Sequence, residues 1–498
     1  MKLIIYFILL IVPGFAQAQW IELGGFNTLS ANNTIFATCA GPSGEIYAGG
    51  LFTNVNGKQY VAKWDGTSWS ELGGVNSLAA NGAIRAICTD NAGNLYAGGS
   101  FLNGNGNRYV AKWDGTSWTE LGGINVLAAN QAIRSLCIDP LGNLYVAGLF
   151  TNTMGKQYVG KFDGAFWTEV GAFNELSANN SIFSVHSDKN GNIYTAGLFK
   201  NDSNRCYIAM WDGTSWSELG GNNSLNASNY IACITSDSSG NVYAGGLFRN
   251  AGMKCYVAKW NDTVWSEVGG INALSANNNI TSICFDAIGN LYAGGAFQNA
   301  TFNRYIAKYD GSSWSELGGS NSIDPNAGSY SVISDASGNI YTAGSIVNSA
   351  FNKYVAKFSC NTEHDTITHT IPSGSSYVFH GDTLKVSGIY HDTLLNSIGC
   401  DSLVTLILTV LPNSLNETVS QNGITIYPNP TTSMVTLSLP IAGYPVKIKM
   451  TDILGKVVSE QNTFKNECII DLSSRSKGMY LVEVEQNGKW YRGKLLKE

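Results

Sequence analysis

Amide and basic side chains recur along this sequence at a fixed spacing and could together bind a polar ligand. In each of seven copies an asparagine follows a short apolar run, and successive asparagines are 49 residues apart. These asparagines are Asn54, Asn103, Asn152, Asn201, Asn250, Asn299 and Asn348. A basic residue follows each of them just before a tyrosine: Lys58, Arg108, Lys156, Arg205, Lys254, Arg304 and Lys353. A second set lies in the connections between copies, at Asn27, Asn76, Asn125, Asn174, Asn223, Asn272 and Asn321.

An amide, a cation and an aromatic ring together have the chemistry to hold a sugar. Asparagine offers donors and acceptors, tyrosine offers a flat apolar surface, and a cation recognises the carboxylate of a uronic or sialic acid. Seven weak sites on one surface would act together and raise the apparent affinity by about 10²- to 10⁴-fold. The alternative is that the asparagines form turns and left-handed backbone, with the tyrosines in the core. Repetition preserves turn residues as readily as binding residues, so both interpretations stay open.

The repeats show no evident catalytic set. The sequence has no H-E-x-x-H motif, and no G-x-S-x-G motif in a strand–turn–helix context. His186, the one histidine of the repeats, stands where other copies have cysteine or other residues, which predicts a core position. We therefore expect a protein that is not an enzyme and needs no cofactor.

One glutamate per copy could suggest a ring of carboxylates. These residues are Glu22, Glu71, Glu120, Glu169, Glu218, Glu267 and Glu316. Each falls on what we expect to be the outermost strand of its copy. Paired-carboxylate glycosidases need carboxyl groups within about 5–9.5 Å of each other, which outer strands of different copies cannot supply. We expect these glutamates to be solvated or salt-bridged.

Metal sites are not expected either. The D-x-x-G-N turns of the repeats lack the carboxylate density of a calcium loop. Four of the five histidines (His364, His369, His380 and His391) fall after the repeats, without zinc-ligand spacing. Cys39, Cys88, Cys137 and Cys284 share one repeat position and resemble small buried hydrophobic residues. Cys360 and Cys400 are the best candidates for a disulfide.

The repeat itself predicts the elements that position these side chains. Each copy holds four strand-like runs separated by turn formers, as at residues 84–90, 94–101, 108–115 and 117–123. Four short antiparallel strands in a unit of this length are typical of a β-propeller blade. Glycine three residues after a recurrent tyrosine, as at Gly50 after Tyr47, predicts close approach of strand backbones. We therefore predict an all-β protein with a seven-bladed β-propeller over residues 19–360.

The N-terminal segment is predicted to close this ring. The last copy ends without a "W-x-E-L-G-G" strand, and that strand is found at Trp20–Gly25 instead. Closure removes an open pair of sheet edges, which would be an aggregation hazard. We expect Trp20 to be buried between blades.

The two ends of the chain indicate export. Residues 1–18 have the layout of a signal peptide, with Lys2, an apolar core and cleavage after Ala18. The net charge of −6 argues against nucleic acid as a partner. No later segment is long and apolar enough for a transmembrane helix. After the propeller we expect a small β module at 361–411, a linker at 412–422 and a β-sandwich at 423–498.

The last segment carries motifs in a recognisable order. They are Tyr427-Pro428-Asn429-Pro430, Asp452-Ile453-Leu454-Gly455-Lys456, Gly478-Met479-Tyr480 and the basic end Lys494–Lys497. This combination resembles the type A C-terminal sorting domain of the type IX secretion system. Residues 375–410 resemble small modules of secreted Bacteroidota proteins. The resemblance implies that the type IX machinery is a partner, and that the cargo is released or attached to surface polysaccharide once the sorting domain is removed.

We therefore expect a secreted or cell-surface recognition or adhesion protein of Bacteroidota type, with the propeller face as a multivalent glycan binder. A non-catalytic scaffold for protein partners is the alternative. A propeller hydrolase or lyase is the least favoured interpretation, because no convergent acid–base set is visible. Fold alone does not assign a function.

Overall fold

The computed structural model describes residues 19–123, 127–319, 328–359, 365–372, 374–379, 381–395, 401–411, 424–439 and 445–498. Within these ranges the chain forms strands and turns, without an α-helix. Accordingly, no described segment is a helix with the length and apolar character needed to cross a membrane. The predicted cleavage site at Ala18 and the linker lie outside the described residues. The chain divides into two compact units, Met1–Asp365 with Asp392–Val404, and Thr366–His391 with Thr405–Glu498.

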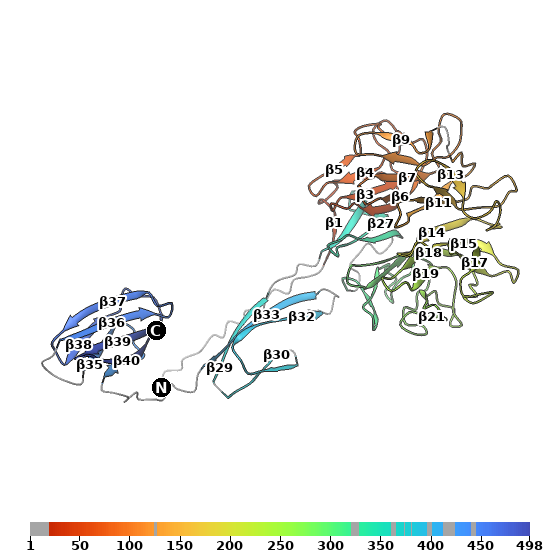
Figure 1. The fold of residues 1–498 in the computed structure, drawn as a ribbon. Helices are drawn as coiled ribbons and strands as arrows, with labels where there is room; N and C mark the ends of the chain where they lie inside the picture. The colour runs from red at the N-terminus through yellow and green to blue at the C-terminus, as the bar shows by residue number, and fades with distance from the viewer. Residues whose placement is uncertain are drawn as a thin grey trace, which may run out of the picture. The chain divides into compact units, whose positions relative to one another are not determined.

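The first unit contains seven four-stranded antiparallel sheets among its described residues (Figure 1). The strands of each sheet are called a to d from one edge to the other. The a strands are β2 (Ile35–Ala40), β6 (Ile84–Thr89), β10 (Ile133–Ile138), β14 (Ile182–Ser187), β18 (Ile231–Ser236), β22 (Ile280–Phe285) and β26 (Ser329–Ser334). The b strands are β3 (Ile46–Gly50), β7 (Leu95–Gly99), β11 (Leu144–Gly148), β15 (Ile193–Lys200), β19 (Val242–Gly246), β23 (Leu291–Gly295) and β27 (Ile340–Val347).

The outer half of each sheet is made by the c and d strands. The c strands are β4 (Ala62–Trp64), β8 (Ala111–Trp113), β12 (Gly160–Phe162), β16 (Cys206–Trp211), β20 (Ala258–Trp260), β24 (Ala307–Tyr309) and β28 (Lys353–Ser359). The d strands are β5 (Trp69–Glu71), β9 (Trp118–Glu120), β13 (Trp167–Glu169), β17 (Trp216–Glu218), β21 (Trp265–Glu267), β25 (Trp314–Glu316) and β1 (Gln19–Glu22).

Consecutive a strands contact each other around a closed ring. Strand β2 contacts β6, the series continues to β26, and β26 contacts β2 again. The a strands are therefore innermost and surround an axis, and each sheet extends outward from it as a blade. This arrangement confirms the predicted β-propeller.

The N-terminal strand completes the last blade, as predicted. Strand β1 pairs antiparallel with β28, with Trp20 opposite Phe358, and it forms the edge of the sheet β1-β28-β27-β26, whose strands β1 and β27 are labelled in Figure 1. The Trp20 side chain is 7% exposed, and its indole N–H donates to the Leu317 carbonyl of the preceding blade at 3.2 Å. The same bond links the other described blades, for example from Trp69 to the Leu23 carbonyl at 2.9 Å. One tryptophan per blade thus joins neighbouring sheets near the rim.

The hydrophobic core lies between neighbouring blades. In one cluster, Tyr47 and Val61 of one sheet pack against Ile84, Leu95 and Phe101 of the next. Close backbone packing explains the repeated glycine, since a Cβ on Gly50 would lie 2.2 Å from the Thr34 carbonyl oxygen. A side chain there would force the a and b strands apart.

An aspartate closes the a–b turn in most copies. In the second blade, Asp90 accepts hydrogen bonds from the Asn94 amide side chain at 2.7 Å and from the Tyr96 hydroxyl at 3.1 Å. Its other oxygen accepts from the backbone N–H groups of Ala92 and Asn94 at 3.0 and 2.8 Å. The D-x-x-G-N pattern is thus a turn, in which the carboxylate satisfies nearby donors.

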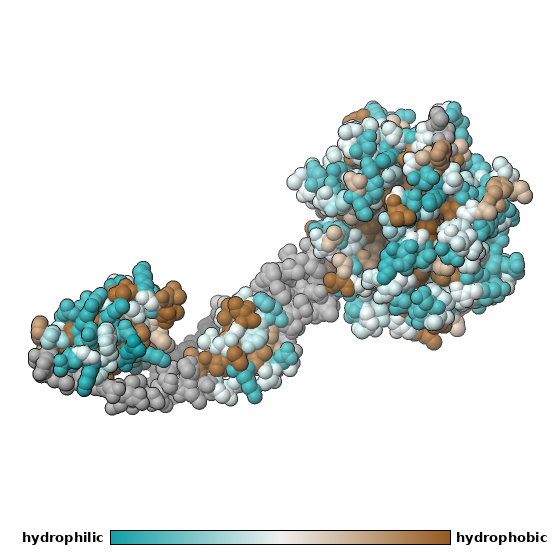
Figure 2. Space-filling view, in the orientation of Figure 1, coloured by the Kyte–Doolittle hydropathy of each residue, from teal (hydrophilic) through white to brown (hydrophobic). Residues whose placement is uncertain are grey.

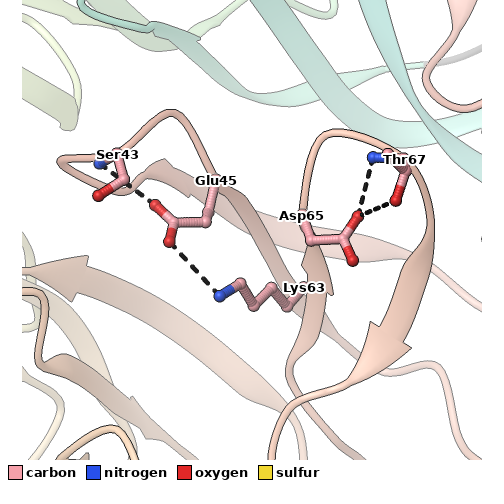
Figure 3. A network of polar contacts seen from close by, with 5 residues as sticks. All are labelled: Ser43, Glu45, Lys63, Asp65 and Thr67. Atoms are coloured by element: carbon pink, nitrogen blue, oxygen red, sulfur yellow. Dashed lines mark hydrogen bonds and ion pairs between the residues drawn. The ribbon is translucent and has the colours of Figure 1, made fainter.

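The first copy closes its a–b turn with different residues. Gly41 and Glu45 stand where the second copy has Asp90 and Asn94. The Glu45 carboxylate accepts from the Ser43 N–H at 3.2 Å and pairs with Lys63 at 3.4 Å (Figure 3). A Cβ on Gly41 would lie 2.7 Å from Glu45 Oε2. The glutamate therefore fills the space that aspartate fills elsewhere.

Figure 3 also shows how the c–d turns close on the same side of the propeller. Asp65 Oδ1 accepts hydrogen bonds from the Thr67 N–H and hydroxyl, both at 2.8 Å. Hydrogen bonds from the backbone of Ser68 and Thr67 lower the pKa of Asp65 to about 2. The a–b and c–d turns thus form one face of the propeller, and their carboxylates are used within the turns.

The remaining strands form smaller sheets. Strands β29 (Asp365–Pro372), β33 (Asp401–Leu411) and β32 (Gly388–Leu395) make a three-stranded sheet, and β30 (Tyr377–Phe379) pairs with β31 (Asp382–Leu384). The C-terminal segment has two sheets. One contains β34 (Thr425–Tyr427), β35 (Met434–Ser438) and β38 (Glu467–Asp471), and the other β37 (Val457–Thr463), β36 (Val446–Asp452), β39 (Gly478–Gln486) and β40 (Lys489–Lys497). Both contribute to one core, as Leu437 and Val482 show.

Candidate ligand-binding face of the propeller

The b–c asparagines lie on the propeller face opposite the a–b and c–d turns. In the first blade, Asn54 Oδ1 accepts from the backbone N–H groups of Asn56 and Lys58 at 3.0 and 3.1 Å. Its Nδ2 donates to Glu71 Oε2 and to Asn76 Oδ1, both at 3.0 Å. An asparagine side chain has two donor hydrogens and two acceptor positions. Asn54 therefore uses its full hydrogen-bonding capacity within the blade.

The same amide–carboxylate contact is found in every blade. The Nδ2–Oε distances are 2.8 Å for Asn103–Glu120, 3.3 Å for Asn152–Glu169, 2.9 Å for Asn201–Glu218, 2.9 Å for Asn250–Glu267, 3.1 Å for Asn299–Glu316 and 3.2 Å for Asn348–Glu22. The glutamates are partly exposed, in keeping with the predicted solvated role, and each also accepts a hydrogen bond from an asparagine amide that the sequence analysis did not predict. This contact forms because the d strand ends beside the b–c loop.

The second set of asparagines supports the same network from the d–a connections. Asn76 donates its backbone N–H to Glu71 Oε1 at 2.7 Å. It also has a φ of 63°, and Asn27, Asn174, Asn223 and Asn272 have φ between 60° and 62°. This left-handed conformation is tolerated best by glycine and asparagine. Asn125 and Asn321 lie outside the described residues.

The tyrosines of the b–c loops pack into the propeller rather than onto its surface. Tyr60 meets the fully buried Phe52 edge to face, with ring centroids 4.9 Å apart. The same pair recurs as Phe150 and Tyr158, also 4.9 Å apart. Burial, followed by the charge of Glu169, raises the pKa of Tyr158 to about 12. Turn and core roles therefore account for the asparagines and tyrosines that the sequence singled out.

The basic residues remain more open to a ligand. Lys58 and Arg205 are exposed, and the side chains of Arg108, Lys156, Lys254, Arg304 and Lys353 are partly exposed. Arg108 donates from Nη1 to the Asn130 carbonyl at 2.8 Å. The ring of cations is thus present on this face, without free amides beside it.

Exposed apolar side chains gather on the same face. On the b–c loops they are Val55, Met154, Met253, Phe302 and Phe351, and on the d–a connections Phe26, Val75, Phe173 and Ile271. On the opposite face, the described residues with large exposed apolar side chains are Leu141, Phe166, Val264 and Ile288. Figure 2 shows such apolar groups among polar ones on the propeller surface in view. Sequence analysis did not single out these loop-tip residues. A large apolar residue in a loop has no role in forming the turn, and this was a signal that the sequence offered.

Sequence analysis also missed the second residue of each a strand. The copies differ at this position, with Phe36, Arg85, Arg134, Phe183, Ala232, Thr281 and Tyr330. The informative signal was variation within an otherwise uniform repeat.

Burial favours the neutral form of one histidine and of several cysteines of the repeats. His186 Nε2 lies 2.9 Å from Ser236 Oγ, and desolvation lowers the pKa of His186 to about 4. Burial raises the pKa of the thiols of Cys39, Cys88 and Cys137. These cysteines are free in the structure.

The candidates after the repeats remain only partly described. Cys360, Cys400, His364 and His380 lie outside the described residues. His369 stacks on Tyr377 at 4.2 Å, and His391 Nδ1 lies 3.1 Å from the Thr405 hydroxyl. Among the residues that the structure describes, no three metal-ligating side chains gather.

The sorting motif residues are brought together with the last strand. Asn429 donates to the Lys494 carbonyl at 2.7 Å and accepts from the Leu496 N–H at 2.9 Å. The Tyr427–Pro428 and Asn429–Pro430 peptide bonds are cis. Gly478 begins β39, and the buried Tyr480 donates to the Ser476 carbonyl at 2.7 Å. The motif thus anchors the start of the segment to its end.

Comparison with known proteins identifies this C-terminal segment. Residues 425–498 match the secretion system C-terminal sorting domain family. No curated protein sequence matches the chain.

Several solved structures resemble the chain at low sequence identity. The extracellular domain described for a hybrid two component system of B. thetaiotaomicron has 14% identity and a TM-score of 0.46, over 93% of this chain and 55% of that protein. PorZ, a surface component of the type IX secretion system of Porphyromonas gingivalis, has 15% identity and a TM-score of 0.37, over 91% and 64%. A fucose lectin from Kordia zhangzhouensis has 20% identity and a TM-score of 0.22, over 27% and 95%. The chain thus spans between half and two thirds of the length of the first two proteins.

The sorting motif and the family match agree on the same residues. The C-terminal segment is a type IX secretion sorting domain, and the protein is exported and either secreted or attached to the outer cell surface.

Proposed function

We propose that the protein is an exported recognition protein whose propeller binds glycans through the face formed by the b–c loops and d–a connections. One observation carries this proposal: basic and large apolar side chains gather at the exposed tips of these loops. Lys58 is three residues after the 95% exposed Val55, and Lys353 is two residues after the 81% exposed Phe351. Large exposed apolar patches mark binding surfaces, and these loops bring several large apolar side chains to one face.

The chemistry of these loop tips fits a sugar surface. Apolar and aromatic side chains can pack on the C–H face of a sugar ring, and neighbouring cations can hold its acidic substituents. Similar loops recur around the ring, so several weak contacts would add through avidity. We propose binding without catalysis, because the glutamates of the d strands lie on separate blades and each is bound by an asparagine amide of its own blade.

A glycan array with the mature chain, residues 19–498, tests the proposal. One variant would combine Lys58→Gln, Arg205→Gln and Phe351→Ser on the proposed face. The matched control would carry Phe166→Ser and Val264→Ser on the opposite face, where both side chains are also exposed. We expect array binding that the first variant loses and the control keeps. Silence of the native chain across the array would instead favour a scaffold for protein partners.

A further inference from the structure

A continuous band of side chains surrounds the propeller axis close to the b–c face. Its members come from the start of the a strands. Tyr330 meets Phe36 at 5.8 Å, Phe183 meets Tyr230 at 5.7 Å, and Asn279 donates to the Tyr230 hydroxyl at 3.2 Å. Tyr330 is 43% exposed, whereas its neighbours Ser329 and Ser331 are 5% and 8% exposed. These side chains therefore face the open axis.

Two arginines on adjacent blades interrupt this aromatic band. The Arg85 guanidinium lies 4.9 Å from the Phe36 ring centroid, and that of Arg134 lies 5.7 Å from the Phe183 ring centroid. Arg85 Nε donates to the Ser100 hydroxyl at 3.2 Å, whereas Arg134 Nε is buried without a partner. Aromatic rings thus hold both guanidinium groups by their flat faces, which leaves N–H groups available at their edges.

No acidic side chain among the described residues forms an ion pair with either arginine. Burial lowers the pKa of Arg134, and the positive charge of Arg85 lowers it further. The glutamates of the d strands lie at the far edge of each blade, and Asp90 and Asp139 lie at the opposite ends of the a strands that carry the two arginines. Two adjacent cations without a counter-ion are unfavourable for the unliganded protein. A bound anion would relieve their repulsion.

We propose that Arg85 and Arg134 form an axial site for the carboxylate or sulfate group of an acidic sugar, with Phe36, Phe183 and Tyr330 against the sugar ring. Guanidinium groups form paired N–H···O bonds with a planar carboxylate or with sulfate oxygens. Flanking aromatic rings offer a flat apolar surface to the sugar. This inference deepens the proposed function and rests on it, because the ligand is a glycan in both.

Titration calorimetry with tetragalacturonate and with its fully methyl-esterified form tests the site, because the two ligands share a sugar chain and differ in charge. Inorganic sulfate provides the free-anion arm. The mature chain would be compared with a variant carrying Arg85→Gln and Arg134→Gln. A control variant carrying Lys112→Gln and Lys189→Gln loses the same formal charge from positions outside the b–c loops and d–a connections. Thermal unfolding of each variant reports whether it remains folded.

We expect the acid to bind the native chain at least about tenfold more tightly than the ester. The axial variant should lose this difference, whereas the control variant should keep it. Added NaCl should weaken binding of the acid, because exposed charge interactions are screened by salt. The axial variant should unfold at the same or a higher temperature than the native chain, because a repulsion has been removed.

Other outcomes would overturn the assignment in distinguishable ways. If the axial variant binds the acid as the native chain does, the arginines are structural, and the proposed glycan function is unaffected. If the native chain binds neutral glycans on the array but never prefers the acid, only the axial assignment fails. If sulfate binds as tightly as tetragalacturonate and no glycan binds the array, both the sugar assignment and the proposed function fail.

Discussion

At the scale of single residues, the contacts of Asn54 show a role in the turn rather than in ligand binding. Its side chain makes four hydrogen bonds within the blade, to Asn56, Lys58, Glu71 and Asn76. We expect Asn54→Ala to lower the free energy of unfolding by about 0.5–1.5 kcal/mol, because the hydrogen bonds to its exposed and partly exposed partners are lost. Urea denaturation followed by circular dichroism would measure this. Asn56→Ala is the control, because only the backbone of Asn56 takes part. A native-like stability for Asn54→Ala would show that the network contributes little.

His186 predicts a pH dependence of stability. Its pKa is lowered to about 4 in the folded protein because the ring is desolvated, whereas an unfolded histidine titrates near pH 6.5. Between these values the unfolded chain binds more protons, so the free energy of unfolding falls as the pH drops. The loss below pH 4 is on the order of 3 kcal/mol.

The measurement for His186 compares native chain and His186→Thr in urea at pH 7.5, 5.5 and 4.5. Threonine is the residue of the next copy, Thr235, so the substitution suits the position. As the pH falls, the free energy of unfolding should decrease more for the native chain than for the variant. A difference that is constant with pH would contradict the neutral, desolvated histidine.

At the scale of elements, the ring depends on strand β1. Trp20 is buried, packs on Phe358 at 5.3 Å and donates to the Leu317 carbonyl. We expect Trp20→Ala to cost about 3–5 kcal/mol, as for other large-to-small changes in a core. It should also favour aggregation, because an unpaired β28 would present a free strand edge. Denaturation and light scattering would measure both effects.

The control for strand β1 is Ile21→Ala, since Ile21 lies on the same strand but is 44% exposed. This variant should unfold within about 0.5 kcal/mol of the native chain, as surface substitutions usually do. Equal losses for the two variants would mean that strand pairing, rather than the buried indole, holds the ring closed.

The blades could be predicted from the sequence because the information for them is local. Turn formers and the alternation of residues within each strand are patterns within one copy, and the 49-residue period shows that every copy repeats them. The partner of Asn54 could not be predicted in this way, since Glu71 is 17 residues away and reaches Asn54 only after the c and d strands fold back. The sequence analysis missed the axial arginines for another reason. Comparing what all seven copies share does not reveal Arg85 and Arg134, because only two copies have arginine at this position.

At the scale of the whole molecule, the sorting domain and the propeller each have their own core. The sorting domain has a core of its own, which includes Val435, Leu437, Ile448 and Leu495. The blades of the propeller are closed by β1 and need no strand from the C-terminal segment. Removing residues 424–498 should therefore leave the propeller folded but stop export at the outer membrane.

This prediction can be checked by cell fractionation in a bacterium that has a type IX secretion system. The full chain should be found on the surface or in the medium, and the chain without residues 424–498 in the periplasm. A Leu437→Asp variant places a charge in a fully buried position of the sandwich, so it should also be retained. The thermal unfolding of the propeller should be the same in the full and the shortened chain. A shortened chain that reaches the surface as efficiently as the full chain would show that the export signal lies outside the sorting domain.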